Sequence, residues 1–453
     1  MLILALLGPG AATPVTAQSL PDLQRRALAV DPAVAGAEAQ VRAAEQRVVQ
    51  ARAAFGPTVG ITANQTETRY REAPNFDLRP FRSKQLALQV TQPLFRTALF
   101  PGLDAAQAQF EQAQAALAQA RIESTQRLVE ACFEVLEARD ALALARAQRV
   151  ATAEQLALAR RSFTVGTVPV TDVREAEARA DAVAAQVQAA EFDPDLRQQV
   201  LAELAAGPAP GLLVRGLDAA RMPRLGVSSA TEWPATAYAQ SWQLRQSEQA
   251  LLVAEAEVGK ARQGHAPTAD LTYQQSMSSD TGTVTSAFPR RGDISQVGVN
   301  INIPLFASGA TQARVRETLA LRDKVRSDAD QTRRTVTLGV RQQLSAALAA
   351  IAQVRGLEAA VRSQELSFRA NRRGYEVGLK VNAQVLDAQG KLFEARRDLS
   401  RARYDAWLAY IRLQAAAGTL SETDLAELDG LLLVVETPDL RVVPPRLRRP
   451  EAP

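Results

Sequence analysis

The sequence has almost none of the residues that build metal centres, disulfides or catalytic triads. Its 453 residues include one cysteine, Cys132, and one histidine, His265. Because cysteine and histidine each occur only once, a disulfide scaffold, a Cys/His zinc site and most histidine-based catalysis are excluded. Cys132 lies in an apolar helical run and is interpreted as a buried small side chain, whereas His265 is interpreted as a helix-end residue. No carboxylate, His or Ser cluster has catalytic spacing, so we expect no enzyme, metal or cofactor.

Aromatic residues, long apolar runs and runs of one charge are also scarce. Aromatic side chains make up only 5% of the chain, which is few for a large compact core but enough for long alanine-rich helices. Beyond the N-terminus no stretch approaches the ~18 consecutive apolar residues of a transmembrane helix, so any membrane insertion would have to use strands. The net charge is only +4, and the Lys and Arg residues are interspersed with Asp and Glu instead of forming a run. We therefore expect no nucleic-acid partner.

The N-terminus resembles a secretory signal peptide, which we assign to residues 1–17. Residues 2–7 are apolar, and Val15-Thr16-Ala17 provides small residues for cleavage before Gln18. The basic residues that usually open such a peptide are missing, which indicates a start codon further upstream. No cysteine follows the cleavage site, so a lipid anchor is not expected.

A heptad pattern dominates the stretch from Gly374 to Gly418. A helix is predicted to begin near Asn382 and to end at Gly418, because glycine is a common C-terminal stop. Alternating spacings of three and four residues predict a coiled coil in which small side chains let the partner helix approach closely. The seam consists of Leu392, Ala395, Leu399, Ala402, Ala406, Ala409, Leu413 and Ala416.

The chain is duplicated internally. The turn at Gly378 is repeated at Gly166, 212 residues earlier, and neighbouring residues match at the same offset. Each half therefore reads as a helix, a strand pair, a very long helix, a turn and a helix. The long helices are expected over about 103–165 and 310–377, and roughly 65 residues would span about 100 Å. The predicted parts are residues 18–190, an equatorial segment at 191–233, residues 234–419, and a tail at 420–453 whose end is expected to be disordered.

Amphipathic strand pairs are predicted at residues 57–94 and 267–304. Apolar and polar side chains alternate in each return strand, and each ends in Pro-Leu-Phe, with Phe95 and Phe306 as candidate members of an aromatic girdle. Periodicity allows two interpretations, a half-buried sheet on a soluble core or a barrel wall between lipid and water. In the second interpretation the lipid-facing residues are Leu86, Leu88, Val90, Val297, Val299, Ile301 and Ile303.

These motifs together resemble the TolC family of outer-membrane channel-tunnels, over about residues 20–419. The motifs that carry the resemblance are Val377-Gly378, Val385-Leu386-Asp387-Ala388, Ala402-Arg403-Tyr404, Val165-Gly166-Thr167, Thr171-Asp172-Val173 and the repeated Pro-Leu-Phe ends. The resemblance implies a mainly α fold with a small β part, in which a long α-helical coiled-coil barrel stands in the periplasm. It also implies a homotrimer, each chain giving four strands to a shared twelve-stranded β-barrel. Four strands alone could not close such a barrel in lipid.

The resemblance also assigns site residues. It implies a periplasmic gate in which Tyr375 and Lys380 bond Thr171 and Asp172, although the last two could instead cap their helix. It places Asp387 in a carboxylate ring across the pore, although an acid also favours a helix N-terminus. Gln384 stands where some channels carry a second acid. The expected adaptor-docking turns are Val165, Gly166, Thr167, Val377, Gly378 and Leu379.

The implied function is passive export of drugs or secreted polypeptides through the Gram-negative outer membrane. The implied partners are a periplasmic adaptor (a membrane fusion protein) and an inner-membrane ABC or proton-driven transporter. A structural periplasmic coiled-coil scaffold is the alternative. It would explain the helices but not the duplicated amphipathic strands.

Overall fold

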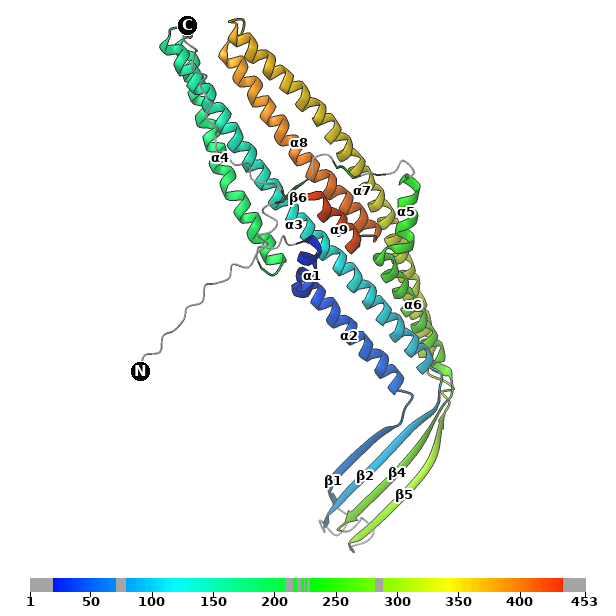
Figure 1. The fold of residues 1–453 in the computed structure, drawn as a ribbon. Coiled ribbons are helices and arrows are strands. Elements are labelled where there is room, and N and C mark those ends of the chain that lie inside the picture. The colour runs from blue at the N-terminus through cyan, green and yellow to red at the C-terminus, as the bar shows by residue number, and fades with distance from the viewer. Residues whose placement is uncertain are drawn as a thin grey trace, which may run out of the picture. The chain divides into compact units, whose positions relative to one another are not determined.

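The computed structural model describes residues 19–70, 79–207, 215–217, 221–223, 225, 229–281 and 288–434 (Figure 1). The expected signal peptide at residues 1–17 and the tail beyond residue 434 lie outside these ranges. The chain divides into two compact units. The first comprises Met1–Ala35, Ala120–Ser241 and Val336–Pro453, and the second comprises Gly36–Gln119 and Trp242–Thr335.

The second unit contains the expected strand pairs as one antiparallel sheet. Its strands are β1 (Thr58–Tyr70), β2 (Arg79–Arg96), β4 (Thr268–Asp280) and β5 (Arg290–Asn302). The spatial order is β1-β2-β4-β5, so the hairpin of each sequence half lies beside the other and the halves join between β2 and β4 (Figure 1). Within this described sheet β1 and β5 are the edges, and each has one unpaired side.

The two return strands differ at their Pro-Leu-Phe ends, which we had expected to be equivalent. β2 continues through Pro93 and Phe95 to Arg96, whereas β5 stops at Asn302, so Ile303 and Pro304 lie outside the strand. β2 is an inner strand whose end is held by β4, and a register shift between Pro93 and Phe95 accommodates the proline. The edge strand β5 has no second neighbour to hold the corresponding residues.

The predicted long helices are present. They are α3 (Leu99–Thr164) and α7 (Ala310–Glu376), and each contributes residues to both units. The helices that follow their turns are α4 (Val170–Leu204) and α8 (Asn382–Ala417). α4 continues past the expected boundary at residue 190 and contains Pro194. A proline inside a helix removes one backbone hydrogen bond, and α4 carries on for ten residues beyond it.

The shorter helices are interrupted once in each half. The first half has α1 (Leu20–Val30) and α2 (Pro32–Ala53), and Asp31 between them accepts a hydrogen bond from the backbone N–H of Ala33 at 2.8 Å. The second half has α5 (Ser229–Gln240), α6 (Trp242–Arg262) and the short 3₁₀ helix η2 (Gln263–His265). The break between α5 and α6 lies at Ser241.

The α8 seam is buried as the heptad predicts, but α8 buries more than this seam. Leu399, Ala402 and Ala406 pack with Ile351 and Val354 of α7. A second buried side of α8 carries large residues that the heptad did not single out, namely Tyr404, Trp407, Leu408 and Ile411. α8 is therefore a core helix with two packed faces, of which the heptad seam is one.

The main hydrophobic core of the first unit surrounds this second side of α8. Tyr404 packs edge-to-face on Phe133 at 5.7 Å between ring centroids, and its hydroxyl donates to Asp140 Oδ2 at 2.7 Å. Burial raises the pKa of the Cys132 thiol, which lies in the same core, to about 12, so this cysteine is inert.

Part of the predicted tail belongs to this core. Helix α9 (Glu422–Leu431) begins with a capping box between Ser421 and Asp424, and β6 (Leu432–Val434) pairs with β3 (Arg215–Leu217) of the equatorial segment. Asp429 of α9 also accepts a hydrogen bond from the backbone N–H of Leu20 at 2.9 Å. The first part of the tail therefore fastens the start of α1, and Leu425 and Leu428 are buried with it.

α7 is the one helix among the described residues that contains an 18-residue window apolar enough for a membrane span by length and composition. Only 22% of this window is buried. The rest of α7 carries many exposed Arg and Asp side chains, as ion pairs such as Arg333–Asp330 and Lys324–Asp328 illustrate.

Candidate gate, docking turns and membrane face

The two repeated turns have the same backbone hydrogen bonds. In the first, the N–H of Gly166 donates to Phe163 O at 2.9 Å and that of Thr167 donates to Ser162 O at 3.0 Å. In the second, Gly378 donates to Tyr375 O at 3.0 Å and Leu379 donates to Gly374 O at 2.8 Å. This pattern is the Schellman motif, which requires a left-handed residue after the helix. Gly166 and Gly378 fill that position with φ of 75° and 76°.

The turns expose apolar side chains. Val165 is 77% exposed, Val377 69% and Leu379 81%. The next helices begin directly afterwards, and neither Pro169 before α4 nor Val381 before α8 provides a side-chain cap. Each turn therefore presents a rigid, apolar tip that nothing in the described chain covers.

The candidate gate residues lie close to these tips, on both helical pairs. Asn382, which is 1% exposed, donates through Nδ2 to the backbone carbonyl of Asp172 at 3.5 Å and so joins the starts of α8 and α4. Thr171 and Lys380 are exposed, whereas Asp172 and Tyr375 are half-buried. No side-chain hydrogen bond joins these four residues in the part of the chain that is described, so the latch stays a prediction.

Two details near the gate were not anticipated. Asn382 was missed, although a polar residue at a helix start that must be buried is a recognisable signal. Lys380 lies over Gly374, where an added Cβ would come within 2.6 Å of the lysine Cγ. The absence of a side chain at Gly374 is therefore what lets Lys380 fold back on its own turn.

The candidate constriction residues lie on the exposed side of α8. Asp387 and Gln384 are exposed, whereas the adjacent Val385, Leu386 and Ala388 are buried. Lys391 Nζ lies 2.9 Å from Asp387 Oδ2, one helical turn later. A hydrogen bond and the charge of Asp387 raise the pKa of the Lys391 ammonium. The i,i+4 spacing of an acid and a lysine could have revealed this pair in the sequence.

The sheet register places six of the seven predicted lipid-facing residues on one face, and the seventh, Ile303, lies beyond the end of β5. Directly opposed residues share a face, and one such row is Val59, Val90, Tyr273 and Val297. The next row along the strands contains Gly60, Gln89, Gln274 and Gln296, and it points the other way. We call the first side the apolar face. Its apolar members are Val59, Ile61, Ala63, Leu86, Leu88, Val90, Leu271, Tyr273, Met277, Val297, Val299 and Ile301, and the register also places Gln92, Gln275, Asp293 and Ser295 on it.

Exposure differs between the two faces at the middle of the inner strands β2 and β4. Met277 of the apolar face is 51% exposed and its neighbour Ser276 is 7% exposed, and Leu86 and Ala87 differ in the same way. This difference does not extend over the whole sheet. Gln89 of the opposite face is exposed whereas Leu88 and Val90 of the apolar face are half-buried, and nearly all residues of β1 and β5 are exposed on both faces.

The register shift between Pro93 and Phe95 of β2 is a β-bulge, and it changes which side chains reach each face of the sheet. After the shift, Phe95 is opposite Ala269, which belongs with the apolar side, and Arg96 is opposite Thr268. The guanidinium of Arg96 then forms two bonds with the Asp270 carboxylate, from Nε at 2.9 Å and from Nη2 at 2.7 Å. A single extra residue thus places an aromatic side chain outward and an ion pair inward, where the two repeats meet.

Among the described residues no group of three His, Cys, Asp or Glu is placed to hold a metal ion. The features with functional geometry are therefore the two tips, the exposed side of α8 and the apolar face of the sheet.

Comparison with known proteins identifies the family. The family model for outer membrane efflux proteins matches residues 23–207 and 233–419, one match for each repeat. The outer membrane protein TolC of Vibrio cholerae is 29% identical over 93% of this chain and 95% of that protein. The alkaline protease secretion protein AprF of Pseudomonas aeruginosa is 30% identical over 92% of this chain and 87% of that protein.

Solved structures show the same fold. The outer membrane protein VceC of Vibrio cholerae superposes with a TM-score of 0.73 at 19% identity, over 88% of this chain and 96% of that one. The outer-membrane channel OprN superposes with a TM-score of 0.75 at 19% identity, over 88% of this chain and 90% of that one. The two-repeat match and the shared fold lead to one assignment: this chain belongs to the family of outer membrane efflux proteins, the TolC-like channels of the Gram-negative outer membrane, and it is not an enzyme.

Proposed function

We propose that three copies of this chain form a channel-tunnel for passive export of drugs or secreted polypeptides. An inner-membrane transporter, acting with a periplasmic adaptor, supplies the energy. The observation that carries this proposal is the pair of matching helical tips, because each helical hairpin of the duplicated chain ends in the same rigid turn with exposed apolar side chains. The names of two relatives add support: AprF is an alkaline protease secretion protein and PrtF of Dickeya chrysanthemi is a proteases secretion protein.

The tips are the docking surface for the adaptor in this proposal. Val165, Val377 and Leu379 offer apolar contacts, while Gly166 and Gly378 fix the backbone. A surface of this kind suits the helical hairpin of a partner, because small apolar side chains on a rigid turn lose little conformational entropy on binding.

The gate lies directly behind the tips. Tyr375 and Lys380 bond Thr171 and Asp172 when the tunnel is closed, and Asp387 lines the constriction together with Gln384. The link from Asn382 to Asp172 supports this arrangement because it brings the two helix starts together. Such contacts lie near water and each contributes only about 0.5–1.5 kcal/mol, so an adaptor can shift the equilibrium toward the open state.

The sheet is the membrane part in this proposal, with the apolar face toward lipid. The free edges of β1 and β5 support sharing of the sheet between chains, because unpaired backbone groups are not tolerated in the hydrocarbon region. Three four-stranded sheets then close into one barrel around a water-filled lumen lined by the opposite face.

Two measurements test the proposal. In planar bilayers the purified protein should give stable single-channel conductance, and crosslinking in detergent should show a trimer. A structural scaffold would give neither conductance nor detergent-dependent solubility, and a crosslinked monomer alone would contradict the channel. Deletion of the gene in its own bacterium, followed by drug susceptibility tests and analysis of secreted protein, then separates drug cargo from polypeptide cargo.

A further inference from the structure

Basic side chains gather where the apolar face ends, near the hairpin connections. Side chains two residues apart on a strand share a face, so Lys84 and Arg82 continue the side of Leu86. The register brings Arg69 of β1 and Arg291 of β5 onto the same face. We call Arg69, Arg82, Lys84 and Arg291 the basic belt.

The belt directly adjoins the apolar surface. Lys84 shares a row with Gln65, Ser279 and Arg291. The next row toward the helices contains Ala63, Leu86 and Met277, with Asp293 at its end on the edge strand β5. Two residues along a strand are about 7 Å, so the cations begin roughly 7 Å from the last apolar row. Lys84 and Arg291 are separated by one strand, which places their backbones about 10 Å apart.

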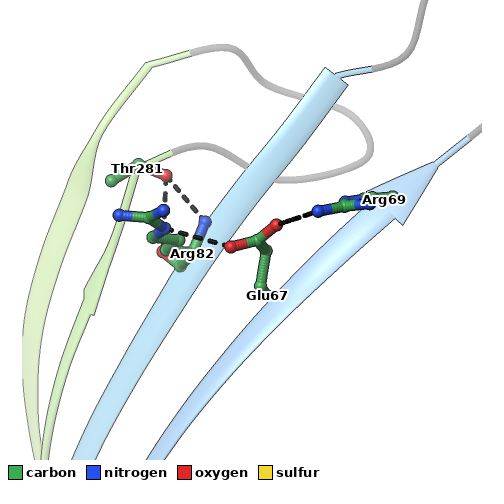
Figure 2. A network of polar contacts seen from close by, with 4 residues as sticks. All are labelled: Glu67, Arg69, Arg82 and Thr281. Carbon is green, nitrogen blue, oxygen red and sulfur yellow. Dashed lines mark hydrogen bonds and ion pairs between the residues drawn. The ribbon is translucent and has the colours of Figure 1, made fainter.

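Glu67 organises one end of the belt (Figure 2). Its Oε1 accepts from Arg69 Nη2 at 3.1 Å and its Oε2 accepts from Arg82 Nε at 3.3 Å. The backbone N–H of Arg82 donates to Thr281 Oγ1 at 2.8 Å, and the backbone N–H of Thr281 donates to Arg82 O at 2.9 Å, so the strand that carries Arg82 is tied to the end of β4.

The contacts leave the belt with unused donors. Arg82 uses only Nε on Glu67, so its two terminal nitrogens have no partner within the described residues. Lys84 and Arg291 make no ion pair within those residues. Among the described side chains near the belt on this face, the four cations are balanced by only two carboxylates, those of Glu67 and Asp293. This leaves an excess of positive charge. Guanidinium groups with free terminal nitrogens suit bidentate contact with phosphate.

We propose that the basic belt binds the phosphate groups of the glycolipid that forms the outer leaflet of the outer membrane. The inference rests on the proposed membrane orientation, in which the apolar face meets lipid and the helices lie in the periplasm. The hairpin ends of the strands then reach the outer leaflet, where the glycolipid headgroups carry phosphate. Acyl chains contact Leu86 and Met277. The phosphates contact Lys84 and Arg291 one row further out and Arg82 two rows further out.

Neighbouring residues of β5 provide a matched control. Arg291 points to the apolar side, whereas Arg290 is opposite Asp280 and points to the other side of the sheet. Arg290→Gln and Arg291→Gln therefore remove the same charge at almost the same height, on opposite faces. Only the second change removes a member of the belt.

Native mass spectrometry of the trimer, released from detergent, tests the proposal with three probes: bisphosphorylated lipid A, the same lipid with both phosphates removed, and inorganic phosphate. The wild type should bind the bisphosphorylated lipid at least about tenfold more tightly than the dephosphorylated lipid. Arg82→Gln combined with Lys84→Gln, and Arg291→Gln alone, should reduce that preference, while Arg290→Gln should not. Millimolar inorganic phosphate should not displace the lipid, because the apolar rows hold its acyl chains.

Equal effects of Arg290→Gln and Arg291→Gln would overturn the belt, as would equal binding of the two lipids by the wild type. Displacement by inorganic phosphate would also overturn it, since it would show a site for the free ion. Planar-bilayer conductance of the same proteins separates this result from the channel proposal. A conducting wild type with no phosphate preference contradicts the belt alone, whereas phosphate-dependent lipid binding without conductance contradicts the channel alone.

Discussion

Lys391 Nζ lies 2.9 Å from the carboxylate of Asp387, on the exposed side of α8 that we assign to the constriction. Each carboxylate of a threefold ring would thus carry its own counter-ion. Lys391→Gln should therefore strengthen block by divalent cations several-fold and shift the reversal potential toward cation selectivity. Asp387→Ala should weaken the block without opening the channel. Lys391→Arg keeps the charge and should behave like the wild type. If Lys391→Gln leaves the block by divalent cations unchanged, the pair lies outside the conduction path.

The latch should respond to the loss of its polar groups. Lys380→Ser combined with Tyr375→Phe should raise single-channel conductance, because two contacts of about 0.5–1.5 kcal/mol each are lost in every chain. Lys324→Ser, at an exposed site on α7, provides the control for removal of a lysine. If the double variant conducts like the wild type, the latch assignment fails and Thr171 and Asp172 serve only the start of α4.

The tips can be tested without straining the turn. Gly378→Trp should abolish export and leave the trimer intact, but Gly378 has a φ of 76°, so any side chain there also strains the backbone. Leu379→Asp adds a charge to a side chain that is 81% exposed and avoids this strain. It should abolish export while conductance and trimer yield stay at wild-type values. If the Leu379→Asp protein and the Gly378→Trp protein both export normally, docking at this turn is contradicted.

The orientation of the sheet predicts opposite outcomes at adjacent positions. Val299→Arg places a charge on the apolar face and should cost about 2–4 kcal/mol near the membrane midplane. Asn300→Arg points to the opposite face and should be tolerated with an altered conductance. The readout is the yield of heat-sensitive trimer in unheated samples of the outer-membrane fraction. Equal yields of the two variants would show that the face assignment is wrong.

Gly418 should be intolerant of a side chain for two reasons. Its φ is 76°, and an added Cβ would lie 2.6 Å from Gln240 O at the break between α5 and α6. The left-handed conformation alone costs about 1–2 kcal/mol for an alanine, so Gly418→Ala should lower the free energy of unfolding by at least that amount. Gly430→Ala, in α9 with open space around it, is the control and should be neutral or slightly stabilising. Thermal or denaturant unfolding of the two variants provides the comparison.

Much of the architecture could be predicted because long periodic segments and repeated glycine and proline turns are strong signals. Gly166, Gly378 and Gly418 all occupy left-handed positions at helix ends, as a glycine stop implies. The alternation in β2 and β5 predicted a two-faced sheet, and the register shows those residues on one side. These features depend on local backbone preference and on periodicity, which a sequence displays directly.

Other features depend on contacts between distant segments and left weaker signals. The burial of Tyr404 depends on Phe133 and Asp140, more than 260 residues earlier, and no heptad position indicates it. The ordered part of the tail was missed because its stability comes from pairing β6 with β3 and from the bond between Asp429 and Leu20. The unequal strand ends depend on whether a neighbouring strand is present, which the Pro-Leu-Phe motif does not encode.

The free edges of β1 and β5 also constrain the order in which the protein can be made. The core around α8, α9 and β3 is built from residues of one chain, so we expect the helical part to begin folding as a single copy. The sheet cannot enter lipid in that state, because a lone sheet would bring two rows of unpaired peptide groups into hydrocarbon. Insertion must therefore wait for association, and the rate of biogenesis should rise steeply with the concentration of the newly secreted chain.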